Sequence, residues 1–142
     1  MTALATVHLL GAALLFGALA VLDLRLLGFS RAIPVRTLAR HVLPWSAVAF
    51  IVVVPTGIAL FLAHAREFID SPLFAIQMVL VLAALVNAGI LHAVTLRTAD
   101  VWDSQEMRNL GPPPSARLAG ALSLVLWAAV IACGRFLAQA AG

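Results

Sequence analysis

Four long apolar stretches limit what this sequence can fold into. Residues 3–28, 42–63, 73–96 and 117–138 are each long and apolar enough to cross a bilayer as a helix. They leave no stretch for a soluble domain in a chain of 142 residues. The mean hydropathy of +1.08 and the charged fraction of 11% agree with a membrane protein. We predict an all-α fold, a four-transmembrane-helix bundle that forms one membrane domain over residues 1–142.

The basic residues predict the orientation of this bundle. The sequence has no lysine, and only Arg66 and Arg135 flank the outer ends of the helices. The other seven arginines flank the first and third connections: Arg25, Arg31, Arg36, Arg40, Arg97, Arg108 and Arg117. By the positive-inside rule we expect a bacterial inner-membrane protein with both termini periplasmic. Because the arginines follow topology and not a soluble surface, we expect the lipid bilayer, and no nucleic acid, as a partner.

The ends of the chain and its cysteine support the same class. The first apolar stretch lacks a basic n-region and is too long for a signal peptide, so we expect it to remain as a helix. The single cysteine, Cys133, excludes a disulfide framework, and the absence of C-x-x-C-H excludes covalent haem attachment.

The third apolar stretch carries a polar stripe. At about 100° per residue, Gln77 and Thr95 coincide, His92 lies about 60° to one side and Asn87 about 80° to the other. Polar side chains in a membrane need partners inside the protein. We therefore expect this stripe to face the bundle, with Gln77 and Asn87 as structural polar residues.

The first stretch places His8 and Asp23 on one side, about 60° apart. Asp23 and Arg25 lie near the cytoplasmic boundary, where a short carboxylate needs a cation or water. We expect Asp23 to form a structural ion pair with a nearby arginine. A proton-handling carboxylate is the alternative.

The second and fourth stretches add a kink and two arginines. Pro55, followed by Thr56 and Gly57, predicts a bend near mid-membrane, with the threonine hydroxyl satisfying a freed carbonyl. Arg117 and Arg135 are 18 residues apart, about 27 Å, on one angular line that we expect to face the bundle. Ser123 lies about 120° from that line, so the sequence offers no evident site for nucleophilic catalysis. Whether the protein is an enzyme stays open.

The four histidines indicate a cofactor. His8 and His64 are expected at the outer face, and His41 and His92 at the inner face. Imidazoles from facing helices can hold b-type haem, and arginines such as Arg117 and Arg135 can pair with its propionates. His8 and His92 are the strongest candidates for metal ligands. The alternative is an interfacial histidine at His8, His41 and His64, and a structural hydrogen-bond donor at His92. Copper or zinc would need three or four convergent ligands, and no H-x-x-x-H spacing occurs.

Several motifs together resemble a known family. They are H-L-L-G and L-D-L-R-L-L-G in the first helix, P-W and T-G-I-A-L-F in the second, N-x-x-x-x-H in the third, and A-R-x-x-x-x-x-S-L-x-L-W ending in G-R in the fourth. This pattern resembles a bacterial family of small four-helix membrane proteins of unknown function. The resemblance marks ten positions: His8, Asp23, Arg25, Trp45, Gly57, Asn87, His92, Arg117, Ser123 and Arg135. The layout is also similar to cytochrome b-type and copper-resistance-type membrane bundles, an architectural analogy.

These observations lead to alternative functions. The first is a b-type haem electron-transfer protein or cytochrome subunit. The second is a non-catalytic membrane subunit or assembly factor that docks a partner protein, and the third is a small proton-linked transporter. Small residues at Ala13 and Gly17 favour a homodimer.

Overall fold

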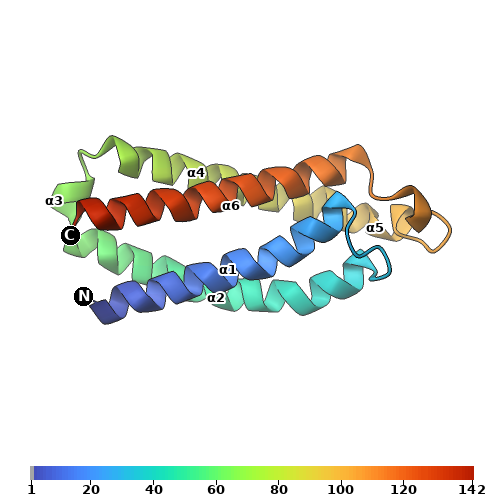
Figure 1. Ribbon diagram of the computed structural model, residues 1–142, viewed down its shortest axis with the longest axis horizontal. Coiled ribbons are helices and arrows are strands. Elements are labelled where there is room, and N and C mark those ends of the chain that lie inside the picture. The colour runs from blue at the N-terminus through green and yellow to red at the C-terminus, as the bar shows by residue number, and fades with distance from the viewer. Residues whose placement is uncertain (1) are drawn as a thin grey trace.

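The computed structural model describes residues 2–142 and consists of helices joined by short connections (Figure 1). Its long elements are α1 (Thr2–Leu27), α2 (Val35–Ala63), α4 (Pro72–Ile90) and α6 (Pro114–Ala140). The helix α4 continues through a π-helical turn, η1 (Leu91–Thr95), into α5 (Leu96–Trp102). Two short elements complete the described chain: α3 (Ala65–Phe68) and the 3-10 turn η2 (Arg108–Leu110). No strand occurs in this part of the chain, so the predicted all-α four-helix fold is confirmed.

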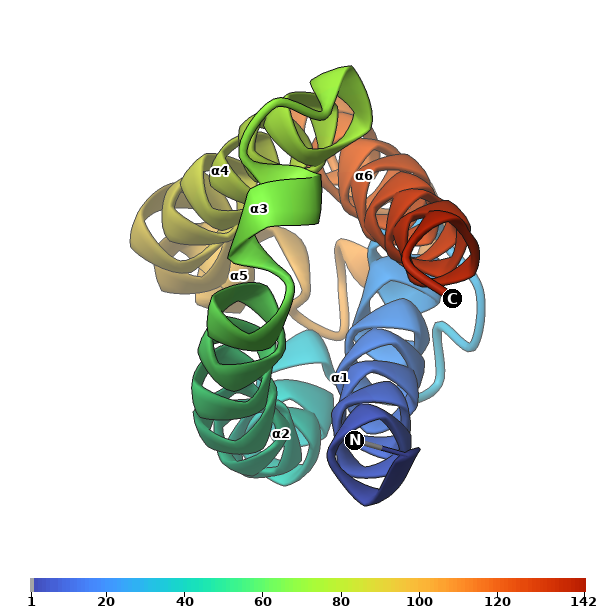
Figure 2. The ribbon, with the colours of Figure 1, turned by 90° about the vertical axis from the view of Figure 1, so that its left-hand side faces the viewer.

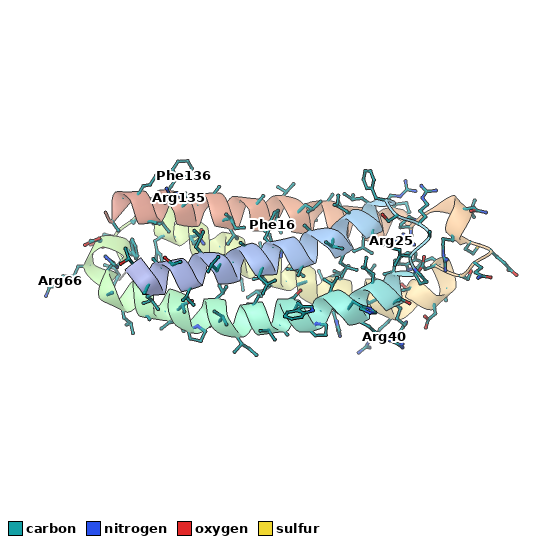
Figure 3. The ribbon with its side chains drawn as sticks, turned by 60° about the horizontal axis from the view of Figure 1, so that its bottom comes forward. Phe16, Arg25, Arg40, Arg66, Arg135 and Phe136 are labelled. Atoms are coloured by element: carbon teal, nitrogen blue, oxygen red, sulfur yellow. The ribbon has the colours of Figure 1, made fainter. Side chains whose placement is uncertain are left out.

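The helices run up and down, with α1 packed against both α2 and α6, and α4 packed against α6 (Figures 1 and 2). Both chain ends lie at one end of the bundle, together with α3. The α1–α2 loop and the α5–α6 connection lie at the opposite end, which we call the arginine-rich end. Figure 3 places Arg25 and Arg40 there, and Arg66 and Arg135 at the other end. The structure thus reproduces the predicted separation of the arginines.

The surface of the bundle is strongly apolar. Leu10, Val79 and Val125 are 64%, 67% and 66% exposed, and many other large aliphatic side chains are similar. A soluble protein would not present such a surface to water, whereas a bilayer accepts it. Within residues 2–142, four helical spans are long and apolar enough to cross a membrane, the third running from Pro72 to Trp102. The protein is therefore a multi-pass membrane protein.

The helices α1 and α6 approach each other closely at Gly120. A Cβ atom at this position would lie 2.9 Å from the Asp23 backbone oxygen and 3.0 Å from the Leu26 Cβ. Ala116 and Ala119, on the same face of α6, are also buried. Small side chains let two backbones come together where lipid offers no hydrophobic drive. This contact fixes which face of α6 lies inside the bundle.

The helix α2 begins at Val35 and not near residue 42, because a distant residue caps it. The Val35 backbone N–H donates to Oδ2 of Asp103 at 2.6 Å, which satisfies one of the free donors of the first turn. The residues V-R-T-L-A-R of the first connection are thus the first turns of α2.

The helix α2 also runs without interruption through Pro44 and Pro55. The Thr56 hydroxyl donates to the carbonyls of Val52 at 2.7 Å and Val53 at 3.1 Å. Pro55 leaves the carbonyl of Ile51, four residues earlier, without its backbone donor, so these two bonds are not the compensation that the sequence predicted.

Candidate functional site

Within residues 2–142, Asp23 is the one acidic side chain buried along the length of a long helix. It is 1% exposed, although it belongs to the last turns of α1. Within residues 2–142, neither of its carboxyl oxygens has a hydrogen-bond partner. The expected ion pair with an arginine is therefore wrong. Asp23 and Arg25 are two residues apart, about 200° around the helix, so they cannot share one partner.

Three helices bring polar groups to the level of Asp23. The Asp23 backbone oxygen faces Gly120 of α6, and the Ser123 hydroxyl lies close to the Asp23 carboxyl group. From α4, Asn87 Nδ2 donates to the Ala119 carbonyl at 3.0 Å. Ser123 and Asn87 are 5% and 9% exposed. A buried polar layer therefore contains Asp23, Ser123 and Asn87, and we call it the carboxyl layer.

Two more unpartnered polar atoms lie in the bundle beyond this layer. Trp127, one turn from Ser123 on α6, is buried, and in the described chain its Nε1–H has no acceptor. The Gln77 Oε1 is likewise buried without a donor, and Gln77 Nε2 lies 3.6 Å from the Cβ position of Gly134. Trp127 packs in an apolar cluster with Leu15, Ala49 and Ala84. The interior thus alternates between polar and apolar levels from the carboxyl layer toward the chain ends.

Asp103 closes the bundle at the arginine-rich end. Its Oδ1 accepts a hydrogen bond of 2.6 Å from Arg25 Nη2, while its Oδ2 accepts from the Val35 N–H. Arg25 Nε also donates to the Ile33 carbonyl at 2.7 Å. Arg25 and Asp103 are 1% and 8% exposed, so this pair is shielded from water. It joins α1, the start of α2 and the end of α5, and we call it the Asp103 clasp.

His8 is held by a different helix. Its Nδ1 lies 3.1 Å from the Val53 carbonyl and 2.9 Å from the Thr56 hydroxyl, both in α2. A carbonyl can only accept, so Nδ1 carries the proton and Nε2 keeps its lone pair. The ring covers Gly57, whose Cβ position is 3.0 Å from His8 Cε1. In the part of the chain that the structure describes, Nε2 has no hydrogen-bond partner, so His8 is a fixed imidazole with one nitrogen available to a ligand.

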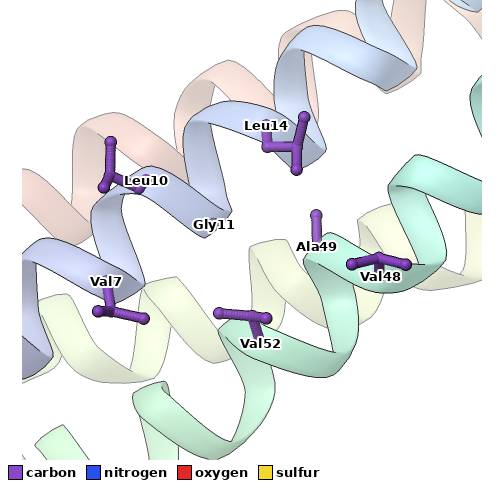
Figure 4. Close-up of a pocket in the computed structure, with 7 residues that line it drawn as sticks. All are labelled: Val7, Leu10, Gly11, Leu14, Val48, Ala49 and Val52. Atoms are coloured by element: carbon purple, nitrogen blue, oxygen red, sulfur yellow. The ribbon is translucent and has the colours of Figure 1, made fainter.

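An apolar depression of about 230 Å³ lies near His8, between α1 and α2 (Figure 4). It is lined by Val7, Leu10, Gly11, Leu14, Val48, Ala49 and Val52. None of these side chains can bind a metal. No group of three His, Cys, Asp or Glu side chains suited to a metal occurs in residues 2–142.

A sequence model described as "Family of unknown function (DUF6644)" matches residues 1–140. The chain belongs to the DUF6644 family. No curated protein and no solved structure gives a significant match.

In this DUF6644 protein the other three histidines lie in separate places. His41 is exposed, with Nδ1 2.9 Å from the Thr37 carbonyl one turn back. His64, at the end of α2, contacts the Leu60 carbonyl and packs against Phe68. His92 is exposed on η1. Its expected place on the bundle side is wrong, because the buried face passes through Asn87, about 140° away.

The arginines of α6 also differ from the sequence prediction. Arg117 and Arg135 are exposed and do not point into the bundle. The buried face follows the small residues Ala116 and Gly120 and continues to Ser123. Arg117 is one residue, about 100°, beyond this face. Ser123, expected away from the interior, is therefore inside it.

Sequence reasoning missed Asp103 in this DUF6644 protein. It lies in a polar connection, where a carboxylate is ordinarily exposed. The signal available in the sequence was the arginine surplus at this end, with few acids to balance it. Only the three-dimensional fold brings Asp103 to Arg25, 78 residues earlier.

Proposed function

We propose that this protein is a small proton-linked membrane carrier of the bacterial inner membrane, with Asp23 as the group that binds and releases the proton. The observation that carries the proposal is the burial of the Asp23 carboxyl group with no hydrogen-bond partner on either oxygen in the described chain. Ionisable residues inside membrane spans commonly mark ion pathways and proton relays.

The chemistry of the site favours a proton over other cations. A buried carboxylate without a counter-ion loses several kcal/mol of hydration, and the neutral Ser123 hydroxyl beside it offsets only part of that loss. A proton removes that charge and needs no coordination shell. Ser123 and Asn87 supply neutral polar groups nearby and no second charge. Metal cations would need several oxygen or nitrogen ligands, which the carboxyl layer does not offer.

The surroundings of Asp23 support controlled access. The Asp103 clasp lies next to Asp23 on the side of the arginine-rich end, because Arg25 of the clasp follows Asp23 by two residues in α1. On the side of Asp23 that faces the chain ends, Trp127 Nε1 and Gln77 Oε1 are buried polar atoms, and an apolar cluster packs around Trp127. Such a closed interior restricts proton movement to binding and release at one group, Asp23. The polar atoms at Trp127 and Gln77 are our candidates for solute contacts.

Proton flux in reconstituted liposomes tests this proposal. Vesicles with a trapped pH indicator, an imposed pH gradient and a balancing potassium pathway would be compared with protein-free vesicles. We expect acid entry with the parent protein, its loss in Asp23→Asn, and its retention in Asp70→Asn, whose carboxylate is exposed. Equal flux in parent and Asp23→Asn would contradict the proposal.

The second candidate is a b-type haem protein for electron transfer, favoured by the geometry of His8. Axial haem ligands commonly donate one ring N–H to a backbone carbonyl, which fixes the ring and leaves the other nitrogen for iron. His8 has this arrangement with Val53. When bound, the haem would supply one-electron redox chemistry. His8 lies over Gly57, and His64 follows Gly57 by seven residues, about 10 Å along the helix. His64 therefore does not face His8.

Absorption spectra before and after reduction test the haem candidate. Expression with ample haem should give a Soret band and a reduced α band that disappear in His8→Asn. That variant keeps a donor near the Nδ1 position, so the helix contact should survive while the ligand nitrogen is lost. Absence of both bands in the folded parent protein would exclude this candidate.

A further inference from the structure

Two arginines converge on a glycine at the arginine-rich end. A Cβ atom at Gly111 would lie 2.9 Å from Arg117 Nη2 and 3.1 Å from Arg31 Nη2. The two guanidinium groups therefore reach the same point from different parts of the chain, the α1–α2 loop and the first turn of α6. Gly111 has a φ of 79°, a backbone conformation that favours glycine. The missing side chain leaves the space between the two cations open.

The Arg31 guanidinium is held in place by backbone carbonyls. Its Nε donates to the Gly28 carbonyl at 3.0 Å, and its Nη1 donates to the Asn109 carbonyl at 3.2 Å. Neither bond neutralises the charge. The remaining nitrogen, Nη2, is the one beside Gly111. Arg31 is thus preorganised with free donors toward the shared point.

No carboxylate balances these two charges in the described chain. The ion pairs there join Arg25 and Arg108 to Asp103, and Arg36 to Asp100. Arg31 and Arg117 form none, and no hydrogen bond of the Arg117 guanidinium occurs within residues 2–142. Two guanidinium groups that reach the same point repel each other, unless an anion lies between them.

Two buried donors at the same end of the bundle make no hydrogen bond within residues 2–142. They are Arg25 Nη1, on a side chain that is 1% exposed, and Arg108 Nε, whose contact with Asp103 Oδ1 is an ion pair at 3.7 Å. Arg108 precedes Gly111 in the same turn, since the Gly111 N–H donates to the Arg108 carbonyl at 3.2 Å. Four arginines therefore lie at this end of the bundle, and Asp103 pairs with two of them, Arg25 and Arg108.

We propose that Arg31 and Arg117 form a binding site for a phosphate group at Gly111. The planar guanidinium presents parallel N–H donors that match phosphate oxygens, and two of them from separate segments can hold one phosphate from two sides. Both side chains are exposed, so a ligand can reach them. The phosphate belongs either to an anionic lipid headgroup or to a soluble phosphate compound. This site is independent of Asp23 and of the proton proposal.

Ligand binding to the purified full chain tests the site in two arms. Native mass spectrometry would count bound phosphatidylglycerol after detergent removal of loosely held lipid. Calorimetry with inorganic phosphate would test the soluble source, with sodium chloride as the ionic-strength control. The test variant is Arg31→Gln/Arg117→Gln. The matched control is Arg66→Gln/Arg135→Gln, which removes two exposed arginines from the opposite end.

We expect binding to weaken roughly tenfold for each arginine removed. Arg31→Lys/Arg117→Lys should restore part of it, since lysine keeps the charge but not the paired donors. Loss of lipid alone in the test variant assigns a headgroup, and loss of inorganic phosphate binding assigns a soluble ligand. Absence of binding in both arms, or equal binding by the parent and the folded test variant, would overturn the proposal. Equal losses in the test and control variants would also overturn it.

Discussion

Arg25 Nη2 donates to Oδ1 of Asp103 at 2.6 Å, and both side chains are almost completely buried. This contact joins the last turn of α1 to the residue that follows α5, and the second carboxyl oxygen caps α2. A single acid in a loop thus holds three segments together. It also explains why the charged Arg25 side chain is tolerated inside the bundle.

Asp103→Asn should strongly destabilise the bundle. It leaves the Arg25 charge buried without its counter-ion, which costs about 3 kcal/mol or more. Thermal unfolding in detergent would measure the change. The control is Asp100→Asn, because the Asp100–Arg36 pair is 71% and 43% exposed and should contribute less than about 1 kcal/mol. A loss of stability in Asp103→Asn as small as the loss in Asp100→Asn would show that the clasp is not needed for stability.

Gly120→Ala should destabilise the protein by about 1–3 kcal/mol. The added methyl group would lie 2.9 Å from a backbone oxygen of α1, which cannot move without shifting the helix. Gly17→Ala is the matched control, since nothing lies within 4 Å of its Cβ position. That substitution should be neutral or stabilising by about 0.5–1 kcal/mol, because alanine favours helix. The predicted signs are opposite, and the same sign at both sites would contradict the close α1–α6 contact.

His8→Ala should cost about 1 kcal/mol of stability, because the contact from Nδ1 to the Val53 carbonyl is lost. His8→Asn should recover much of this loss. Denaturant or thermal unfolding of the two variants would measure the difference. His41→Ala is the control, since His41 is exposed and contacts only its own helix. Identical losses in His8→Ala and His8→Asn would argue against a hydrogen-bond role.

His92→Ala should leave stability within about 0.5 kcal/mol of the parent, as is usual for an exposed position. Any haem spectrum should also remain, because His92 does not face the bundle interior. Loss of the spectrum in His92→Ala, with retention in a folded His8→Asn, would assign the ligand to His92 and reverse our choice.

The sequence predicts the helices well because their signal is local. Length and apolar content are enough to place four spans. The arginine count also predicts which connections share one end of the bundle.

The faces of the helices are harder to predict, because polarity and packing compete. In α6 the small residues Ala116 and Gly120 decided the inner face, not the line of the two arginines. Asn87 of α4 and His92 of η1 are about 140° apart around the helix axis, so they cannot both face the bundle. Asn87 is buried and His92 is exposed.

The partners of charged residues depend on contacts across the whole chain. Asp23 has several arginines close in sequence and pairs with none in the described structure. Arg25 instead pairs with Asp103, 78 residues away. No local pattern encodes that choice, so the clasp and the unpartnered carboxyl group emerge only from the fold.

The protonation of Asp23 in the membrane tests the central claim most directly. Infrared difference spectroscopy of the reconstituted protein at neutral pH would compare the parent with Asp23→Asn in the region of the carboxylic acid carbonyl stretch. We expect a band of a protonated, weakly hydrogen-bonded acid in the parent, absent from Asp23→Asn and present in Asp70→Asn. An ionised carboxylate at Asp23, with no acid band lost on substitution, would contradict the account.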